Sequence, residues 1–217
     1  MVKVTELIVL HTTKFGENSL VVHTLSKDYG RRGFLVRGIG KKSAMSFFQP
    51  LSILEADIIE SSKSSLYTAR NISLKHSLTG IRESMFKNSM TMFMAEVLYR
   101  TVKDGANEDG LFEWCEKNIL TLDAIQSDFS NFHIRFLLEF AIALGFSPEA
   151  ENLQPFTGSH YPIAERFMKE SFAGSMLIPL SGAARNEIAE EILRYIEFQT
   201  ESALNINSLK VLRELFS

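Results

Sequence analysis

The spacing of hydrophobic positions changes once along the chain, near residue 76. Before that point, short runs rich in Val, Ile, Leu, Phe and Tyr alternate with turns that contain Gly, Asn, Asp and Ser. This pattern predicts five β-strands, at residues 6–12, 20–26, 32–38, 51–59 and 66–72. Five short strands at regular spacing favour a small closed or nearly closed sheet over a sandwich. The third strand alternates imperfectly, because each of its faces would hold both an arginine and apolar side chains.

After residue 76 the apolar positions recur about every 3.6 residues, which predicts helices. These helices cover residues 80–105, 111–122, 129–144, 186–203 and 208–216, with Asn186 as the N-cap of the fourth. Residues 147–162 are polar and broken, which predicts a long loop. We therefore expect an α+β chain of two domains: a five-stranded barrel of the OB-fold type at residues 1–78 and an all-helical domain at residues 79–217.

The distribution of charge adds more to this picture than the overall composition does. Of 217 residues, 45% are hydrophobic and 23% are charged, which is ordinary for a globular protein. Residues 1–75 hold 11 Lys and Arg against 6 Asp and Glu, whereas residues 76–217 hold 12 against 20. The first part therefore carries +5 and the second −8, so the first part suits a polyanionic partner.

The sequence gives no sign of secretion, of a membrane span or of a thiolate metal site. Glu6 interrupts the first apolar run, no small-residue cleavage site follows, and no segment reaches about 18 apolar residues. We therefore expect a cytoplasmic protein. Cys115 is the only cysteine, which excludes an internal disulfide. Because Glu113 and Glu116 flank it, we expect a packed core thiol and not a reactive one.

Motifs for catalysis are missing, so we do not expect an enzyme. The five histidines never form a close ligand pair, and neither H-E-x-x-H nor G-x-S-x-G occurs. "GIGKKS" fails the phosphate-loop pattern because Leu35 stands where the first glycine is required. His133 fits a partly buried helix residue. No cofactor and no metal are expected.

The stretch "YGRRGFLVRGIGKKS" (29–43) holds five basic residues and four glycines and no acid. With Lys27, these cations would gather at the ends of a strand hairpin and along the third strand, where OB-folds bind oligonucleotides. A solvated surface face is the alternative reading. The glycines 38 and 40 would permit close approach of a strand or simply make the turn. Aromatic side chains that could stack on bases are interleaved with this cluster, namely Tyr29, Phe34, Phe47 and Phe48.

The longer stretch "LHTTKFGENSLVVHTLSKDYGRRGFLVRGIGKKS", followed by "FFQPLSILEADI", carries several features together. They are the aromatic-small-Glu-x-Ser/Thr-Leu turn that begins at Phe15, the pair Gly30 and Arg31, the basic "VRGIGKK", and Gln49 with Pro50. The pattern continues in "MAEVLYRTV", "GLFEWCEKNILTL", "FHIRFLLEFAIALGFSP" and "ILRYIEFQTESALNINSLKVLREL". In these features the chain resembles the bacterial recombination mediator family RecO over nearly its whole length.

The resemblance implies an N-terminal OB-fold, a helical C-terminal domain, and action at the bacterial nucleoid. It implies binding of single- and double-stranded DNA and annealing of complementary strands. It also implies action with RecR on strands coated by single-stranded-DNA-binding protein, so that RecA can load. Many members of the family carry a four-cysteine zinc site after the helix that ends here at "LGFSP". This sequence has "EAENLQPFTGSHYP" there, so zinc is not implied, and His160 alone cannot hold a metal.

The resemblance also points to site residues. The candidates for DNA phosphates are Arg31, Arg32, Arg37, Lys41 and Lys42, with Lys14 and Lys27 as weaker additions. For the acidic C-terminal tail of single-stranded-DNA-binding protein, the candidate cation is Arg135, beside a pocket of Phe132, Phe136 and Leu138. An i,i+4 ion pair between Arg135 and Glu139 is the alternative.

Two other functions stay open at this point. The first is an OB-fold module that binds RNA or a protein partner and has no role in recombination. A comparison of DNA with RNA of the same sequence would separate it from the DNA reading. The second is a degraded enzyme or nuclease, against which the missing catalytic sets argue.

Overall fold

The structure is a computed structural model that describes residues 2–38, 45–61 and 66–216. The chain forms two compact units, one of Met1–Thr79 with Ala95–Ile119 and one of Gly80–Met94 with Leu120–Ser217. Two helices, α3 (Met85–Thr101) and α4 (Leu111–Ala124), contribute residues to both units. The boundary at residues 78–79 stays a prediction.

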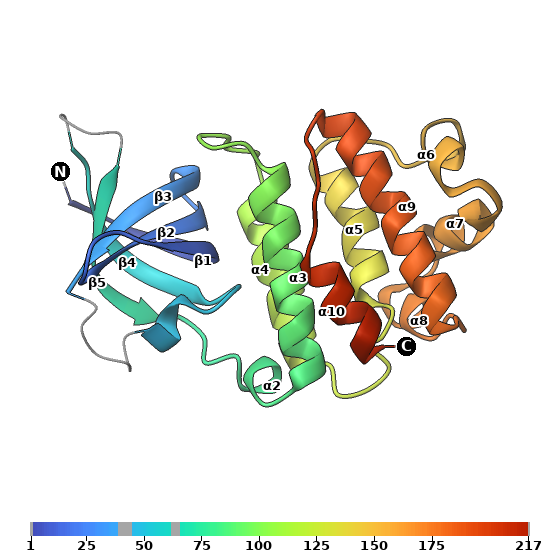
Figure 1. Cartoon of the computed structure of the whole chain (residues 1–217), viewed down its shortest axis with the longest axis horizontal. Helices are drawn as coiled ribbons and strands as arrows, with labels where there is room; N and C mark the ends of the chain where they lie inside the picture. The colour runs from blue at the N-terminus through green and yellow to red at the C-terminus, as the bar shows by residue number, and fades with distance from the viewer. Residues whose placement is uncertain (1, 39–44, 62–65, 217) are drawn as a thin grey trace. The chain divides into compact units, whose positions relative to one another are not determined.

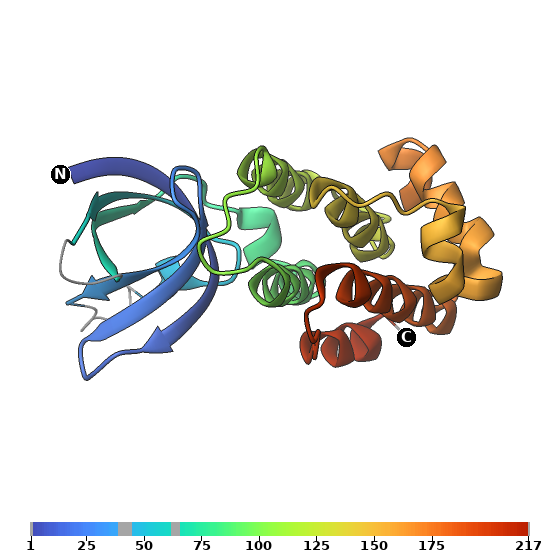
Figure 2. The ribbon, with the colours of Figure 1, turned by 90° about the horizontal axis from the view of Figure 1, so that it is seen from above.

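The first unit contains the closed five-stranded barrel that the pattern predicts (Figures 1 and 2). Its strands follow the order β1-β2-β3-β5-β4, and β1 closes the barrel because its first half pairs with β4 and its second half with β2. Of the strand pairs described, β3–β5 is parallel and the other four are antiparallel. The strands are β1 (Val2–Lys14), β2 (Ser19–Ser26), β3 (Gly30–Arg37), β4 (Ile53–Ile59) and β5 (Tyr67–Leu74). The fold class is therefore confirmed for this half of the chain.

Apolar side chains are buried on both faces of the strands, which explains the imperfect alternation in β3. The inner face packs into the barrel core, where Phe34 and Val36 of β3 meet Leu7 of β1. The outer face is buried too, because Ile8 and Leu35 are less than a tenth exposed. A short 3₁₀ helix, η1 (Ser46–Phe48), adds aromatic side chains to the barrel core.

The helical part that follows the barrel is also confirmed. In the second unit α5 packs against α7, α8 and α9, and α6 packs against α7 and α9 (Figure 1). None of the helices described combines the length and the apolar character needed to cross a membrane. The bounds are α2 (Thr79–Arg82), α5 (Phe132–Ala143), α6 (Ala150–Thr157), η2 (Gly158–His160), α7 (Tyr161–Lys169), α8 (Phe172–Met176), α9 (Gly182–Thr200) and α10 (Ser208–Leu215).

Two predictions for the second unit were wrong. Residues 147–162 are not a long loop, because they contain α6, the turn η2 and the start of α7. In α6 only Leu153 and Thr157 are buried, so the apolar stripe is too short to reveal the helix in the sequence. Likewise, Asn186 does not cap α9. That helix begins four residues earlier, where the Ser181 hydroxyl accepts a hydrogen bond from the amide of Ala184.

His133 of α5 was predicted to be partly buried and is fully buried, with its ring edge-on to that of Phe93. Burial, helped by the charge of Arg185, lowers the pKa of His133 to about 3. An unfolded histidine titrates near 6.5. The neutral folded ring therefore stabilises the chain fully above that pH, and this stabilisation is lost as the pH falls toward 3.

We expect the buried imidazole to make the wild-type chain less stable in weak acid. Between pH 7 and 5 its contribution to the free energy of unfolding should fall by about 2 kcal/mol. Urea titrations at both pH values check this, with His133→Gln as the control because glutamine does not titrate. The stability of the variant should change less over this range, and an equal loss in both proteins would contradict the assignment.

Candidate nucleic-acid interface

The predicted DNA-binding cations do not lie together. Lys27, Arg31 and Arg32 lie at or near the β2–β3 turn, whereas Lys14 and Arg37 lie at the other end of the hairpins. We call this second place the β1–β2 end, because the turn from β1 to β2 lies there. Arg37 belongs to it because Arg37 pairs with Ser19, and the amide of Gly38 donates to the carbonyl of Asn18. Six residues of strand separate Arg31 from Arg37, a distance of about 20 Å. Lys41 and Lys42 lie outside the described residues.

Arg31 is buried and points away from solvent. Its residue is only 8% exposed, and its guanidinium carbon lies 4.6 Å from the centre of the Tyr99 ring. Nη1 lies 2.5 Å from Oδ1 of Asp104, and Nη2 donates to the Tyr99 carbonyl oxygen at 3.4 Å. The backbone is tied as well, because the Arg31 amide donates to the Ala106 carbonyl and the Gly105 amide donates to the Arg31 carbonyl. Arg31 thus joins the barrel edge to the turn after α3, within the first unit.

The neighbouring cations at the β2–β3 end are also engaged. Lys27 Nζ lies 3.4 Å from Glu6 Oε2, and Glu6 is in turn 2.9 Å from Lys75 Nζ. These two lysines lower the pKa of the Glu6 carboxyl, which keeps it charged. The Arg32 guanidinium carbon stacks 3.9 Å from the centre of the Tyr67 ring. Lys27 is paired with a carboxylate and one face of the Arg32 guanidinium is covered by a ring, so this end offers less free charge to a phosphate than its cation count indicates.

The β1–β2 end has the features that a nucleic-acid strand requires. Lys14 and Arg37 are exposed there, and among the residues described no carboxylate oxygen lies within 4.0 Å of the charged group of either. Between the two strands the Phe15 side chain is 55% exposed at the tip of the turn, beside Gly16. An exposed ring flanked by cations is suited to stacking on a base while the cations hold the flanking phosphates.

Sequence reasoning missed two residues near this end. Arg70 of β5 is exposed and lines a cavity of about 400 Å³ together with Arg37. Asn71 follows it with a left-handed backbone, at a φ of 51°. Arg70 was visible as a basic residue in the fifth predicted strand. Its nearness to Arg37 was not, because it depends on how β3 and β5 meet.

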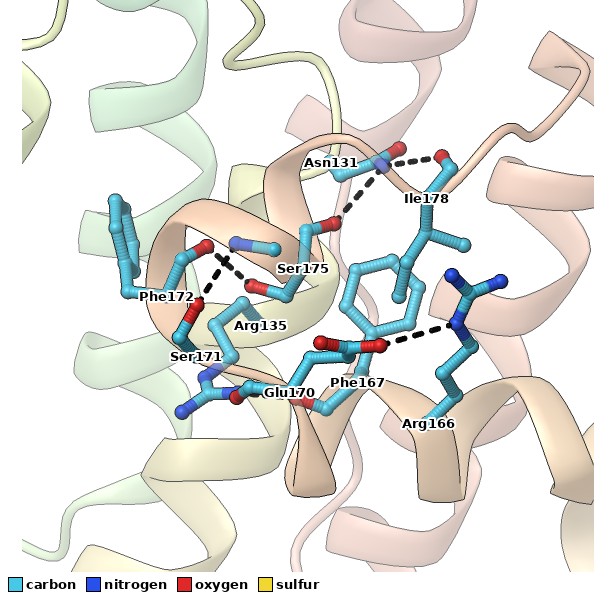
Figure 3. Close-up of polar contacts among 10 residues, drawn as sticks. Asn131, Arg135, Arg166, Phe167, Glu170, Ser171, Phe172, Ser175 and Ile178 are labelled. Carbon is cyan, nitrogen blue, oxygen red and sulfur yellow. Dashed lines mark hydrogen bonds and ion pairs between the residues drawn. The ribbon is translucent and has the colours of Figure 1, made fainter.

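The candidate tail-binding residues in the second unit are packed. Phe132, Phe136 and Leu138 are each at most 1% exposed, so as placed they line no open pocket. Arg135 Nε lies 2.5 Å from Glu139 Oε1, which is the alternative ion pair, and Nη1 donates to the carbonyls of Phe167 and Glu170 (Figure 3). Arg135 therefore satisfies carbonyls at the C-terminal end of α7. A tail-binding role for these residues stays a prediction.

Residues 149–162, where the resemblance implied no zinc site, are held by packing and hydrogen bonds. Leu153 and Thr157 of α6 are buried, and His160 Nδ1 lies 3.1 Å from both carboxylate oxygens of Glu191 in α9. Within the described ranges, no group of three or more His, Cys, Asp and Glu side chains is arranged to hold a metal ion. Cys115 is buried, and burial raises the pKa of its thiol.

Comparisons with known proteins agree with this layout. A family model described as "Recombination protein O N terminal" matches residues 1–78, and one described as "Recombination protein O C terminal" matches residues 82–153. A relative from Phocaeicola vulgatus, named DNA repair protein RecO, is 30% identical with both chains covered in full. Its namesake from Bacteroides fragilis is 28% identical, again over both whole chains. Another from Flavobacterium johnsoniae is 31% identical over 69% of this chain and 64% of its own.

The two family models together cover well over half of the chain, and they follow the same order as the barrel and the helices. The resemblance seen in the N-terminal motif is thereby confirmed. The chain belongs to the recombination protein O (RecO) family.

Proposed function

We propose that this chain is a DNA-binding recombination mediator that acts in DNA repair. It binds single- and double-stranded DNA and anneals complementary strands. With RecR, it helps RecA to load onto strands that single-stranded-DNA-binding protein covers. The observation that carries the proposal is membership of the RecO family, whose relatives bear the name DNA repair protein. The exposed cations at the β1–β2 end support it independently.

The chemistry of this function is association, and no bond is made or broken. Two complementary strands repel each other through their phosphates until cations neutralise that charge. Lys14 and Arg37 would each displace condensed counterions from one strand, and Phe15 would hold a base by its face. In this proposed site Arg31 does not contact DNA. It fixes the start of β3, whose far end carries Arg37.

The test measures DNA affinity against salt for a double variant of the β1–β2 end. Each single-strand phosphate contact adds about 0.7 to the slope of log K against log salt. We therefore expect Lys14→Gln with Arg37→Gln to weaken binding and to reduce the steepness of the slope by about 1.4. Annealing of complementary oligonucleotides coated with single-stranded-DNA-binding protein should slow in parallel.

A matched control removes the same charge from elsewhere in the first unit. Lys27→Gln with Arg100→Gln neutralises two exposed cations that already face Glu6 and Glu96. Its salt slope should stay close to that of the wild type, and equal slopes for all three proteins would refute the assignment to the β1–β2 end. RNA of the same sequence serves as a further probe. Tighter binding of RNA than of DNA would favour the RNA-binding alternative.

A further inference from the structure

A cavity opens at the side of the barrel where β3 and β5 part. Among the residues described, these two strands pair at Phe34 with Tyr67 and at Leu35 with Thr68, and no further pair joins them toward Arg37. The gap has a volume of about 400 Å³ and lies within the first unit. Mouths and gaps of β-barrels are common ligand sites, and this volume is in the range of small-molecule pockets.

The cavity has an apolar floor. Val36, Phe48 and Ala69 all line it, and all three belong to the buried core of the barrel. Each is less than a tenth exposed, so the gap ends on core side chains. Phe47 of η1 also lines the gap and packs against the same core. A flat apolar group entering here would contact carbon atoms and an aromatic ring.

The rim of the cavity is cationic. Arg37 at the end of β3 and Arg70 in β5 both line it, and both are exposed. Asn71 lies beside Arg70 and also lines the gap. The rim therefore favours a ligand whose polar end is an anion, whereas the floor favours a ligand whose other end is apolar.

A bulge in β5 builds this rim. Glu55 pairs with Ser73 and Asp57 with Arg70, so β5 has one residue more than β4 across this stretch. Asn71 takes the left-handed backbone that accommodates the extra residue, and its side-chain amide donates to Asp57 at 2.7 Å. Bulges of this kind can turn side chains toward binding sites, and asparagine adopts the left-handed backbone at little cost.

A nucleotide within a strand matches both parts of this cavity. We propose that the gap between β3 and β5 takes one base of a bound DNA single strand, with the flanking phosphates on Arg37 and Arg70. This inference rests on the proposed DNA binding and adds a subsite to it. A base held in the gap cannot pair, so it would anchor the strand while neighbouring bases stay free to meet a complement.

The experiment compares oligothymidylate with a sugar–phosphate strand of equal length that lacks bases. Both carry the same charge, so phosphate contacts alone cannot distinguish them. We expect the gap to contribute about tenfold to the wild type's preference for the strand with bases, the order expected for one well-held base, in addition to any stacking on Phe15. Thr68→Phe, which places a ring in the cavity, should lose that tenfold contribution and keep the salt slope. Thr68 lines the gap, whereas Ser73 of the same strand does not and is exposed, so Ser73→Phe is the matched control.

A second measurement needs no variant. A strand with 2-aminopurine should brighten when the wild type binds it, because a base moved out of its stack is no longer quenched by its neighbours. Equal preference in Thr68→Phe and Ser73→Phe, or unchanged fluorescence on binding, overturns the cavity while the DNA-binding function stands. Failure of the wild type to bind either strand overturns the proposed function itself, and the cavity with it.

Discussion

Gly30→Ala is expected to lower the free energy of unfolding of the first unit by about 4 kcal/mol. Gly30 has a φ of 62°, where a β-carbon alone costs roughly 1 to 2 kcal/mol. The added methyl would also be driven onto the Ala106 carbonyl oxygen, which is backbone and cannot rotate away. That same carbonyl accepts a hydrogen bond from the Arg31 amide. Movement that relieves the clash therefore breaks the contact between the start of β3 and residues 104–106.

Gly16→Ala separates the two contributions. Gly16 has a comparable φ of 72°, but a β-carbon there meets no atom within 4 Å. We expect this control to cost only the backbone penalty, about 1 kcal/mol. Urea denaturation followed by circular dichroism measures both. If the two substitutions lower the free energy of unfolding equally, the contact between residue 30 and the Ala106 carbonyl contributes nothing to stability.

The contacts of Arg31 explain why the charge pattern alone predicted an exposed cation where the structure has a buried one. Arg31 and Arg37 look equivalent in the sequence, since both are arginines on a strand near glycine. Asp104 and Tyr99, which engage Arg31, lie about seventy residues further along, so no local pattern could show them. Arg37 stays exposed because β3 ends with it. Reversal of Arg31 to Glu would therefore test folding first and DNA binding second.

Some elements of the fold could be predicted from the apolar pattern, and others could not. The barrel strands and α5 were predicted because their apolar periods are long enough to read, as in the run around Phe136. The bulge at Asn71 was not, because it depends on register with Asp57 across the sheet. The polar α6, with two buried residues, depends on packing against α9 that no pattern in its own eight residues records.

One buried side chain in the second unit organises the segment that follows α8. The two hydrogens of the Asn131 amide are shared among the carbonyl oxygens of Ser175, Met176 and Ile178, which lie 3.2, 3.1 and 2.8 Å from its nitrogen. The contacts with Ser175 and Ile178 can be followed in Figure 3. Its carbonyl oxygen accepts from Arg185 Nε at 3.0 Å. Asn131 is 1% exposed, so water cannot replace it.

Asn131→Leu is accordingly expected to destabilise the second unit by about 4 kcal/mol. Leucine fills a similar volume but removes the two N–H donors that these carbonyls share and the acceptor of Arg185 Nε, and each buried polar group left without its partner costs about 1 to 3 kcal/mol. Asn118→Leu is the matched control. Asn118 is also buried, yet its side-chain amide donates to the Trp114 carbonyl of its own helix. We expect that change to cost about 1 kcal/mol or less.

A second substitution, at Arg185, tests whether the loss of stability in Asn131→Leu comes from the hydrogen bonds that Asn131 and Arg185 share or from Asn131 alone. Besides Asn131, its guanidinium donates to the carbonyls of Leu180 and Phe216, so it ties the start of α9 to the end of α10. If Asn131 and Arg185 act together, Arg185→Met should lower the free energy of unfolding clearly less in the Asn131→Leu background than it does alone, because the hydrogen bond between the two residues is already lost. Urea titrations of the single and double variants measure this coupling, and purely additive losses would mean that Asn131 and Arg185 stabilise the segment independently.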